Sequence, residues 1–282
     1  MSIIIDGRII ADKIKEQTKK QVKELVSLGI TPCLGVVLVG HNKASETYVG
    51  KKREAAKEVG IDFQLFQFED NITEEVLIEN IRSIQKTNNL SGLIIQLPLP
   101  ENLYTPHVLN CIDPSIDVDC LTSENLGKLF IHAEYVTPPT PAAVMSVIHE
   151  LNINLPGKNI AIVGVGALVG KPLSVMLMNE RASVTTINSA TQNTTEKCLA
   201  ADIIVTGVGK RNLITADMVH KNSIVIDTGF VFEDGKSSGD VDFDSVAPLV
   251  AAITPTPGGI GPITVAQLLQ NTVLCAQKKN HR

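Results

Sequence analysis

The chain has 282 residues, of which 44% are hydrophobic and 20% are charged, and its formal net charge is −5. These values predict a globular protein of one or two domains, and the acidic balance excludes a surface built to bind nucleic acid. The first residues carry charges where a signal peptide has an apolar core, and no apolar run reaches the ~20 residues that span a bilayer. Five scattered cysteines without a C-x-x-C pair indicate neither a disulfide framework nor a zinc site. We therefore expect a cytoplasmic protein with no metal and no membrane partner.

In the first third of the chain, helical and strand patterns alternate. Helical periodicity covers Gly7–Leu28, Ala44–Gly60 and Thr73–Lys86, and the strand patterns are Cys33–Gly40, Asp62–Phe68 and Gly92–Leu97. This alternation predicts an α/β domain whose parallel or mixed sheet is covered by helices. Leu97–Pro100 ends the block, and Val136–Pro141 (VTPPTP) is typical of a linker or domain crossing.

A glycine cluster opens the second half of the chain. The apolar run Ile160–Val163 ends in Gly164, Gly166 and Gly170, and an amphipathic segment follows. This pattern is typical of a strand, a tight turn and a helix N-terminus that bind a dinucleotide pyrophosphate, because glycines let the backbone approach the phosphates. The spacing G-x-G-x-x-x-G is one residue longer than the common fingerprint, so a purely structural strand-to-helix turn is the alternative.

Further strands are expected after this cluster at Ala182–Ile187, Asp202–Thr206, Ser223–Asp227 and Ala251–Thr254. Helical segments are expected between the first four strands of this half of the chain. A βαβ array of about 110 residues has the size of a Rossmann-type domain. Thr254–Thr264 (TPTPGGIGPIT) is too rich in glycine and proline to form a regular element. Pro262 fits the first turn of a final helix that runs to about Gln277.

Tyr48 and Lys52 are four residues apart in a predicted helix, so their side chains share one face and can reach one ligand. A lysine in a partly dry cleft can have a lowered pKa and move protons near neutrality, although the same spacing is common on solvated helices. Tyr-x-x-x-Lys is also the signature of short-chain dehydrogenases. In those enzymes the glycine loop precedes the tyrosine, whereas here Tyr48 precedes Gly164, so that interpretation fails.

Polar residues at three other places are candidates for ligand binding. Gln96 ends a buried apolar strand and faces either a core partner or a cleft at the strand ends. Asp117 and Asp119 point the same way if their segment is extended, with helix capping as the alternative. Asn188 and Ser189 stand where NAD-binding folds usually place an acidic residue on the ribose. The missing carboxylate favours NADP, although this strand end also lacks an arginine to bind the 2′-phosphate.

Taken together, these residues resemble the bifunctional methylenetetrahydrofolate dehydrogenase/methenyltetrahydrofolate cyclohydrolase family over essentially the whole length. The segments that carry the resemblance are YVGKKREAAKEVGI, GLIIQLPLP, DVDCLTSENLGKL, PPTPAAVM, GALVGKP and TPTPGGIGPITVAQLLQNT, of which the last is the most specific. The resemblance implies an α/β chain of two domains. Residues 1–135, completed by 256–282 with the C-terminal helix, would form the catalytic, folate-binding domain, and residues 136–255 the Rossmann-type NAD(P)-binding domain.

The resemblance also implies roles for single residues. Lys52 would be the general acid/base of the cyclohydrolase step, Tyr48 would pack against the folate and orient the lysine, and Gln96 would support Lys52. Asp119 would hold the pterin ring. The cofactor would be lined by Gly164, Val165, Gly166, Ser189 and Phe230, and the substrate would be covered by Pro257, Gly258 and Gly259.

The implied activity is oxidation of 5,10-methylenetetrahydrofolate with NADP, or alternatively NAD, followed by hydrolysis to 10-formyltetrahydrofolate in one-carbon metabolism. The implied assembly is a homodimer. The sequence departs from the family where Val165 and Gly166 replace the common Arg-Ser, and where Cys120 replaces the usual glycine after Asp119. These departures leave two alternatives, a dehydrogenase-only relative and a non-catalytic folate- or nucleotide-binding homologue. A shikimate-type dehydrogenase would share the two-domain plan but is not expected to carry the PGGIGP segment.

Overall fold

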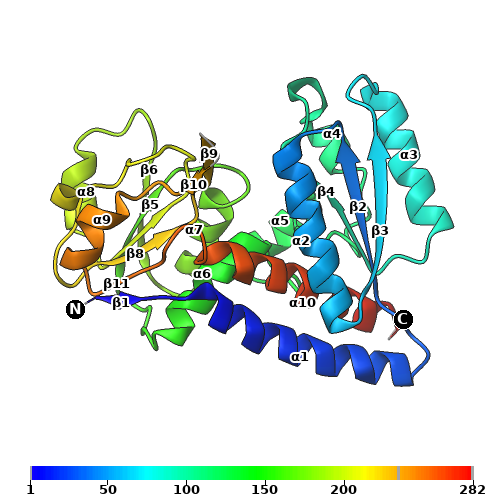
Figure 1. Ribbon diagram of the computed structural model, residues 1–282, viewed down its shortest axis with the longest axis horizontal. Coiled ribbons are helices and arrows are strands. Elements are labelled where there is room, and N and C mark those ends of the chain that lie inside the picture. The colour runs from blue at the N-terminus through cyan, green and yellow to red at the C-terminus, as the bar shows by residue number, and fades with distance from the viewer. Residues whose placement is uncertain (1, 234–235, 281–282) are drawn as a thin grey trace. The chain divides into compact units, whose positions relative to one another are not determined.

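The structure, a computed structural model, describes residues 2–233 and 236–280 and divides into two compact units (Figure 1). Among the described residues, unit 1 comprises 2–11 and 140–264, and unit 2 comprises 12–139 and 265–280. The predicted α/β class with two domains is confirmed, as is the return of the C-terminal helix to the first domain. The two units differ from the predicted ranges at residues 2–11 and 256–264, which lie in unit 1, and at residues 136–139, which lie in unit 2. Residues 2–11 join unit 1 because β1 (Ile3–Ile4) pairs in parallel with β11 (Ala252–Ile253).

Unit 2 is built on a three-stranded parallel sheet. Its order is β3 (Asp62–Phe68), β2 (Cys33–Val39) and β4 (Gly92–Ile95). Every residue of the central strand β2 is buried, as its unbroken apolar sequence predicts for a strand covered on both faces. The helices that lie wholly in this unit are α2 (Lys43–Val59), α3 (Glu74–Thr87), α4 (Pro106–Leu109), α5 (Ser123–Phe130) and the 3₁₀ helix η1 (Glu101–Leu103).

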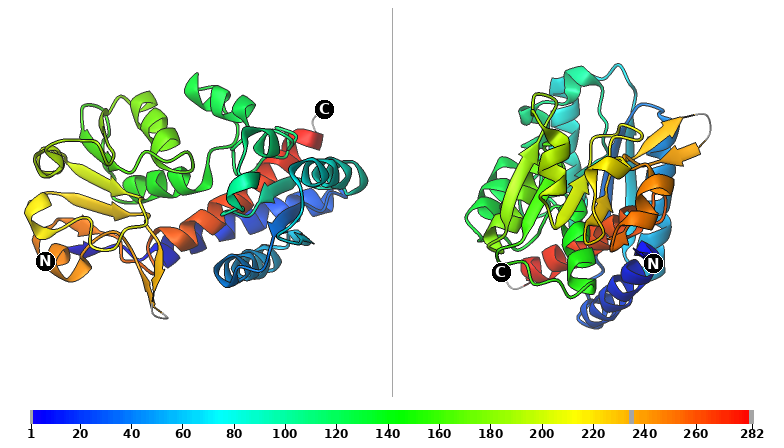
Figure 2. Two further views of the ribbon diagram at one scale, coloured as in Figure 1. Left: turned by 90° about the horizontal axis from the view of Figure 1, so that it is seen from above. Right: turned by 90° about the vertical axis from the view of Figure 1, so that its left-hand side faces the viewer.

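Two clusters of apolar side chains cover the two faces of this sheet. On one face, Val36 and Leu38 pack with residues of α2 and α10 (Ile260–Asn280), whereas on the other Val37 packs with residues of α3. Within this unit, α1 (Gly7–Ser27) and α10 lie side by side in every view, and the Thr18 hydroxyl donates to the side-chain oxygen of Gln270 at 2.9 Å (Figures 1 and 2). Helix α2, which carries Tyr48 and Lys52, is therefore fixed against a fully buried strand.

Unit 1 contains a six-stranded parallel sheet in the order β1-β11-β8-β7-β5-β6. Its main strands are β5 (Asn159–Val163), β6 (Ser183–Ile187), β7 (Ile203–Thr206) and β8 (Ile224–Asp227). The chain passes from β5 to β6 on one side and then returns to β7 on the other side of β5. Ligands of doubly wound folds bind at this reversal, and the glycine cluster follows β5 directly.

The connections of unit 1 differ in places from the predicted ones. The boundary between the two units lies inside the predicted crossing segment Val136–Pro141. Helix α6 (Pro139–Glu150) already begins within that segment, because prolines in the first turn of a helix remove no hydrogen bond. Only the 3₁₀ helix η2 (Ala216–Met218) joins β7 to β8, and the antiparallel pair β9 (Val231–Glu233) and β10 (Lys236–Ser238) was not predicted. The remaining helices are α7 (Gly170–Asn179), α8 (Thr194–Leu199), α9 (Phe243–Val246) and η3 (Ala247–Leu249).

Candidate active site

Lys52 and Gln96 form the centre of the candidate site in unit 2. The Lys52 ammonium donates a 2.9 Å hydrogen bond to the side-chain oxygen of Gln96. Gln96 is only 7% exposed, and its backbone N–H continues the β4–β2 ladder by donating to Val37. Its side-chain NH₂ donates to the carbonyl of Leu97 at 2.6 Å, so its oxygen is directed at the lysine. The sheet thereby fixes the acceptor that positions the lysine.

Helix α2 places Tyr48 and Lys52 one turn apart, as the spacing predicted. The helix begins after Asn42, whose side chain accepts from the N–H groups of Ala44 and Ser45, and ends at Gly60 in a left-handed conformation with φ 84°. Tyr48 is half-buried, and this burial raises the pKa of its phenol. The side chains of Tyr48 and Lys52 are therefore both partly shielded from water.

Asp119 is electrostatically coupled to Lys52. Burial lowers the pKa of Lys52, and the Asp119 carboxylate partly opposes that effect. Burial raises the pKa of Asp119 to about 6, with Lys52 lowering it and Asp117 raising it further. A lysine with a lowered pKa and a carboxyl with a raised one exchange protons closer to neutral pH than either group does in water.

Asp117 has a structural role that separates it from Asp119. Its carboxylate is 1% exposed and accepts from the backbone N–H and the hydroxyl of Thr122, at 2.9 and 2.7 Å, and from the Asn125 amide at 3.0 Å. Thr122 is the N-cap of α5, so Asp117 holds the start of that helix. The segment forms a turn rather than an extended strand, with Cys120 at φ 56°, so the two carboxylates do not form the alternating pair that an extended segment would give.

The glycine cluster of unit 1 forms a tight turn between β5 and α7. Gly164 has φ 101°, and a Cβ there would lie 2.7 Å from the carbonyl oxygen of Gly207. A Cβ at Gly170 would collide with the Gly164 carbonyl, whereas one at Gly166 would meet nothing within 4 Å. Val169, the N-cap of α7, offers no capping side chain. The turn therefore leaves an open side and a helix N-terminus that fit a pyrophosphate.

The other predicted cofactor residues belong to the same unit. Val165 is half-buried, while Gly166 and Ser189 are exposed. Phe230 is 41% exposed and follows β8, just as Ser189 follows β6. Since the strands are parallel, these residues follow the carboxyl ends of the sheet, where ligands of such folds bind.

Pro257, Gly258 and Gly259 also belong to unit 1, whereas Lys52 belongs to unit 2. The backbone N–H of Gly7 donates to the Gly258 carbonyl at 2.9 Å, and a Cβ at Gly7 would collide with the Gly259 carbonyl. Sequence analysis missed this role of Gly7. Its only signal was a glycine at the start of a long helix, where the residue is unfavourable unless the backbone needs room.

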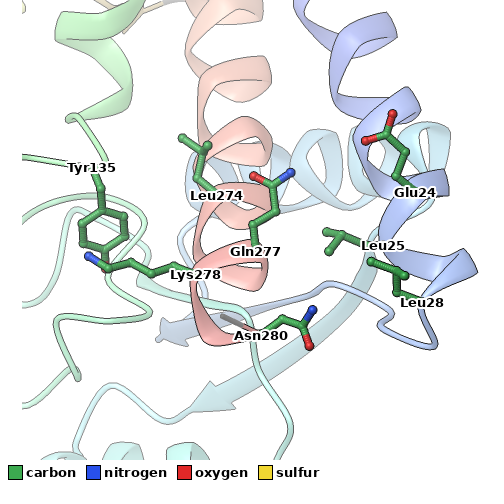
Figure 3. Close-up of a pocket in the computed structure, with 8 residues that line it drawn as sticks. All are labelled: Glu24, Leu25, Leu28, Tyr135, Leu274, Gln277, Lys278 and Asn280. Atoms are coloured by element: carbon green, nitrogen blue, oxygen red, sulfur yellow. The ribbon is translucent and has the colours of Figure 1, made fainter. Parts of the chain in front are cut away.

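A separate cavity of about 540 Å³ lies in unit 2 (Figure 3). It is lined by Glu24, Leu25, Leu28, Tyr135, Leu274, Gln277, Lys278 and Asn280. In this cavity the Lys278 ammonium lies 3.4 Å from the centre of the Tyr135 ring. None of the predicted site residues lines this cavity.

Within residues 2–233 and 236–280, no three His, Cys, Asp or Glu side chains gather in a way that could hold a metal ion. All five cysteines are free thiols. In the same residues, none of the helices combines the length and the apolar character that crossing a membrane requires.

Two family models match the chain. Residues 5–119 match the tetrahydrofolate dehydrogenase/cyclohydrolase catalytic domain, and residues 138–280 match the NAD(P)-binding domain of the same family. The bifunctional protein FolD of Nautilia profundicola is 45% identical over 275 residues, which cover 97% of each chain.

Solved structures agree with these matches. The bifunctional FolD dehydrogenase/cyclohydrolase of Campylobacter jejuni superimposes with a TM-score of 0.95 at 38% identity, covering 99% of this chain and 100% of that one. The Trypanosoma brucei dehydrogenase-cyclohydrolase, solved with NADP cofactor and inhibitor, has a TM-score of 0.95 at 32% identity, covering 100% of this chain and 99% of that one. The chain therefore belongs to the tetrahydrofolate dehydrogenase/cyclohydrolase family.

Proposed function

We propose that this protein oxidises 5,10-methylenetetrahydrofolate to 5,10-methenyltetrahydrofolate with NADP and hydrolyses the product to 10-formyltetrahydrofolate. The observation that carries the proposal is the hydrogen bond of Lys52 to Gln96 beside Asp119, in the part of the chain that matches the family's catalytic domain. The bifunctional names of the relatives and the NADP in the Trypanosoma brucei structure support both the paired activities and the cofactor.

Within this proposal, the residues of unit 2 handle the protons of the hydrolytic step. NADP supplies the hydride acceptor, and removal of the hydride leaves a resonance-stabilised methenyl cation on the substrate. Water adds to that cation, and Lys52 takes and returns the protons that open the ring. The Gln96 oxygen orients the Lys52 ammonium, Tyr48 packs against the folate, and Asp119 holds the pterin ring. The lowered pKa of Lys52 supports its assignment as general acid/base.

The residues of unit 1 bind the cofactor and cover the substrate in this proposal. Gly164, Val165 and Gly166 line the pyrophosphate side, Ser189 the ribose side, and Phe230 the remainder of the cofactor. Pro257, Gly258 and Gly259 cover the substrate. Support comes from the open side of the glycine turn and from the position of these segments after parallel strands.

A dehydrogenase-only enzyme, including an NAD-linked one, is the second candidate. It is favoured by Val165 and Gly166, which offer no polar side chain for a 2′-phosphate, and by Cys120 beside the Asp119 carboxylate.

An assay with NADP and NAD in parallel, following the methenyl and formyl products, separates the two candidate functions. The bifunctional proposal expects NADP-dependent oxidation and accumulation of the formyl product above the uncatalysed rate. Accumulation of the methenyl product alone would support the second candidate, and binding without turnover would support a non-catalytic homologue.

We further propose that the protein acts as a cytoplasmic homodimer. The family resemblance supports the dimer, and β6 forms an edge of the six-stranded sheet, where another chain can be accommodated. Five free thiols are consistent with a reducing compartment. Light scattering of the purified chain tests the dimer, with a monomer mass as the contrary result.

A further inference from the structure

A buried carboxylate in unit 1 organises the loop that follows β7. Asp240 is fully buried. One of its oxygens accepts from the Thr206 hydroxyl at 2.8 Å and from the Val208 N–H at 2.6 Å. The other oxygen accepts from the N–H groups of Gly209 and Lys210, at 2.9 and 2.8 Å. Three consecutive backbone donors therefore converge on one side chain, and that side chain sets the path of residues 207–210.

This loop packs directly on the glycine turn. A Cβ at Gly164 would lie 2.7 Å from the Gly207 carbonyl oxygen and 2.9 Å from a methyl group of Val208. Gly207 and Val208 of the loop after β7 therefore pack directly against Gly164, the first glycine of the turn. Because this contact is already tight, a shift of residues 207–208 by a few tenths of an ångström would displace Gly164.

A second buried carboxylate holds Asp240 in place. Asp227, at the end of β8, is 3% exposed and accepts from the N–H groups of Gly229, Asp240 and Val241, at 2.8, 3.2 and 3.1 Å. A Cβ at Gly229 would collide with the Asp240 carboxylate, so glycine is needed for this approach. Gly229 directly precedes Phe230. Asp240 therefore contacts the segments that follow β7 and β8, and through Gly207 and Val208 it is linked to the glycine turn that follows β5.

We propose that Asp240 is a positioning residue for the nicotinamide cofactor, which it does not touch itself. It acts by holding residues 207–210 against Gly164 and by seating the segment that ends in Phe230. This inference rests on the proposed function, since it takes the glycine turn as the cofactor site. It goes beyond the residues assigned above, because Asp240 carries no cofactor-binding signature in the sequence.

The test replaces Asp240 by asparagine. An amide has one oxygen where the carboxylate has two, so whichever way it is oriented, at least one loop N–H loses its acceptor. The KM for NADP is expected to rise about tenfold or more, which corresponds to the loss of one hydrogen bond to a charged group. The Kd of NADPH, measured by its fluorescence, is expected to rise by the same factor. Asp244→Asn, an exposed aspartate on α9, is the matched control and is expected to leave both constants unchanged.

The same chain contains an internal reference for folding. Hydrolysis of methenyltetrahydrofolate is assayed without nicotinamide cofactor, and its rate in Asp240→Asn is expected to equal that of the wild type. An unchanged KM for NADP, or a parallel loss of both activities in a folded variant, would overturn the inference. If the wild type itself showed no NADP-dependent oxidation, the proposed function would fail instead.

If Asp240→Asn does not fold, a milder pair of variants at Thr206 tests the positioning role of Asp240. Thr206→Val removes only the hydroxyl donor to Asp240, and Thr206→Ser keeps it. The inference expects a raised KM for NADP in the valine variant and a wild-type value in the serine variant. Equal KM values in the two variants would contradict it.

Discussion

The ammonium of Lys52 and the side-chain oxygen of Gln96 lie 2.9 Å apart, and they come from a helix and from the end of a buried strand. The strand fixes the glutamine through its backbone bond to Val37, and the Leu97 carbonyl fixes the amide orientation. The lysine therefore has an acceptor that does not depend on a bound ligand. This pre-organisation is what general acid/base catalysis requires.

Replacing Lys52 by methionine is expected to abolish the hydrolytic step. A methionine keeps the length of the side chain but cannot carry a proton, and loss of a general acid/base lowers a rate by about 10²–10⁴-fold. NADP-dependent oxidation should be affected less, because its chemistry is hydride transfer. The measurement is the rate of methenyltetrahydrofolate hydrolysis, with Lys57→Met, an exposed lysine in the last turn of the same helix, as the control. Hydrolysis at the wild-type rate would contradict the role of Lys52.

Two substitutions at Gln96 are expected to move the pKa of Lys52 in opposite directions. Gln96→Leu removes the oxygen that stabilises the ammonium, so the already lowered pKa of Lys52 should fall further. Gln96→Glu places a carboxylate at that point, so the pKa should rise. The pH–rate profile of hydrolysis reports both, through shifts of the limb due to Lys52 to lower and to higher pH. Shifts of the same sign would show that Gln96 does not act through the lysine.

Asp119→Asn is expected to change how stability depends on pH. Burial raises the pKa of Asp119 from 3.8 to about 6, so the folded chain binds this proton more tightly than the unfolded chain does. The contribution of this proton to the free energy of unfolding, about 1–3 kcal/mol, is fully present below pH 4 and is lost as the pH rises through 6. The Tm of the variant relative to wild type should therefore increase from pH 4 to pH 7. A difference that is flat or falls over this range would refute the assignment.

Glycine at position 120 is expected to be tolerated at least as well as alanine. Cys120 is fully buried at φ 56°, and the left-handed region costs a non-glycine residue roughly 1–2 kcal/mol. Both Cys120→Ala and Cys120→Gly lose packing of the sulfur, but only glycine relieves the backbone. Urea unfolding of the two variants compares them directly. An alanine variant that is clearly the more stable would mean that side-chain packing outweighs the strain.

The conformation of Cys120 also gives a physical reason for one departure from the family resemblance. The usual glycine after Asp119 suits a left-handed residue, and the turn keeps this conformation although the side chain is present. The departure at Val165 and Gly166, by contrast, is not explained by backbone conformation or packing. Gly166 is exposed and a Cβ there would meet nothing, so no packing requirement dictates its identity.

The sequence by itself determined the class of fold, the predicted strands and the helical pairing of Tyr48 with Lys52. These features depend on local periodicity, which a window of a few residues contains. The motifs were also sufficient to identify the family, because the Tyr48–Lys52 segment and the PGGIGP segment occur in a specific order along the chain.

Tertiary structure alone decided which polar residues meet. Local patterns could not distinguish Asp117, which holds the start of α5, from Asp119, which is coupled to Lys52. They also gave no sign that Gly7 is needed against Gly259, or that Asp240 collects the N–H groups of a loop some thirty residues earlier in the chain. The contacts of Asp119, Gly7 and Asp240 join residues far apart in sequence, so their partners become defined only when the chain has folded.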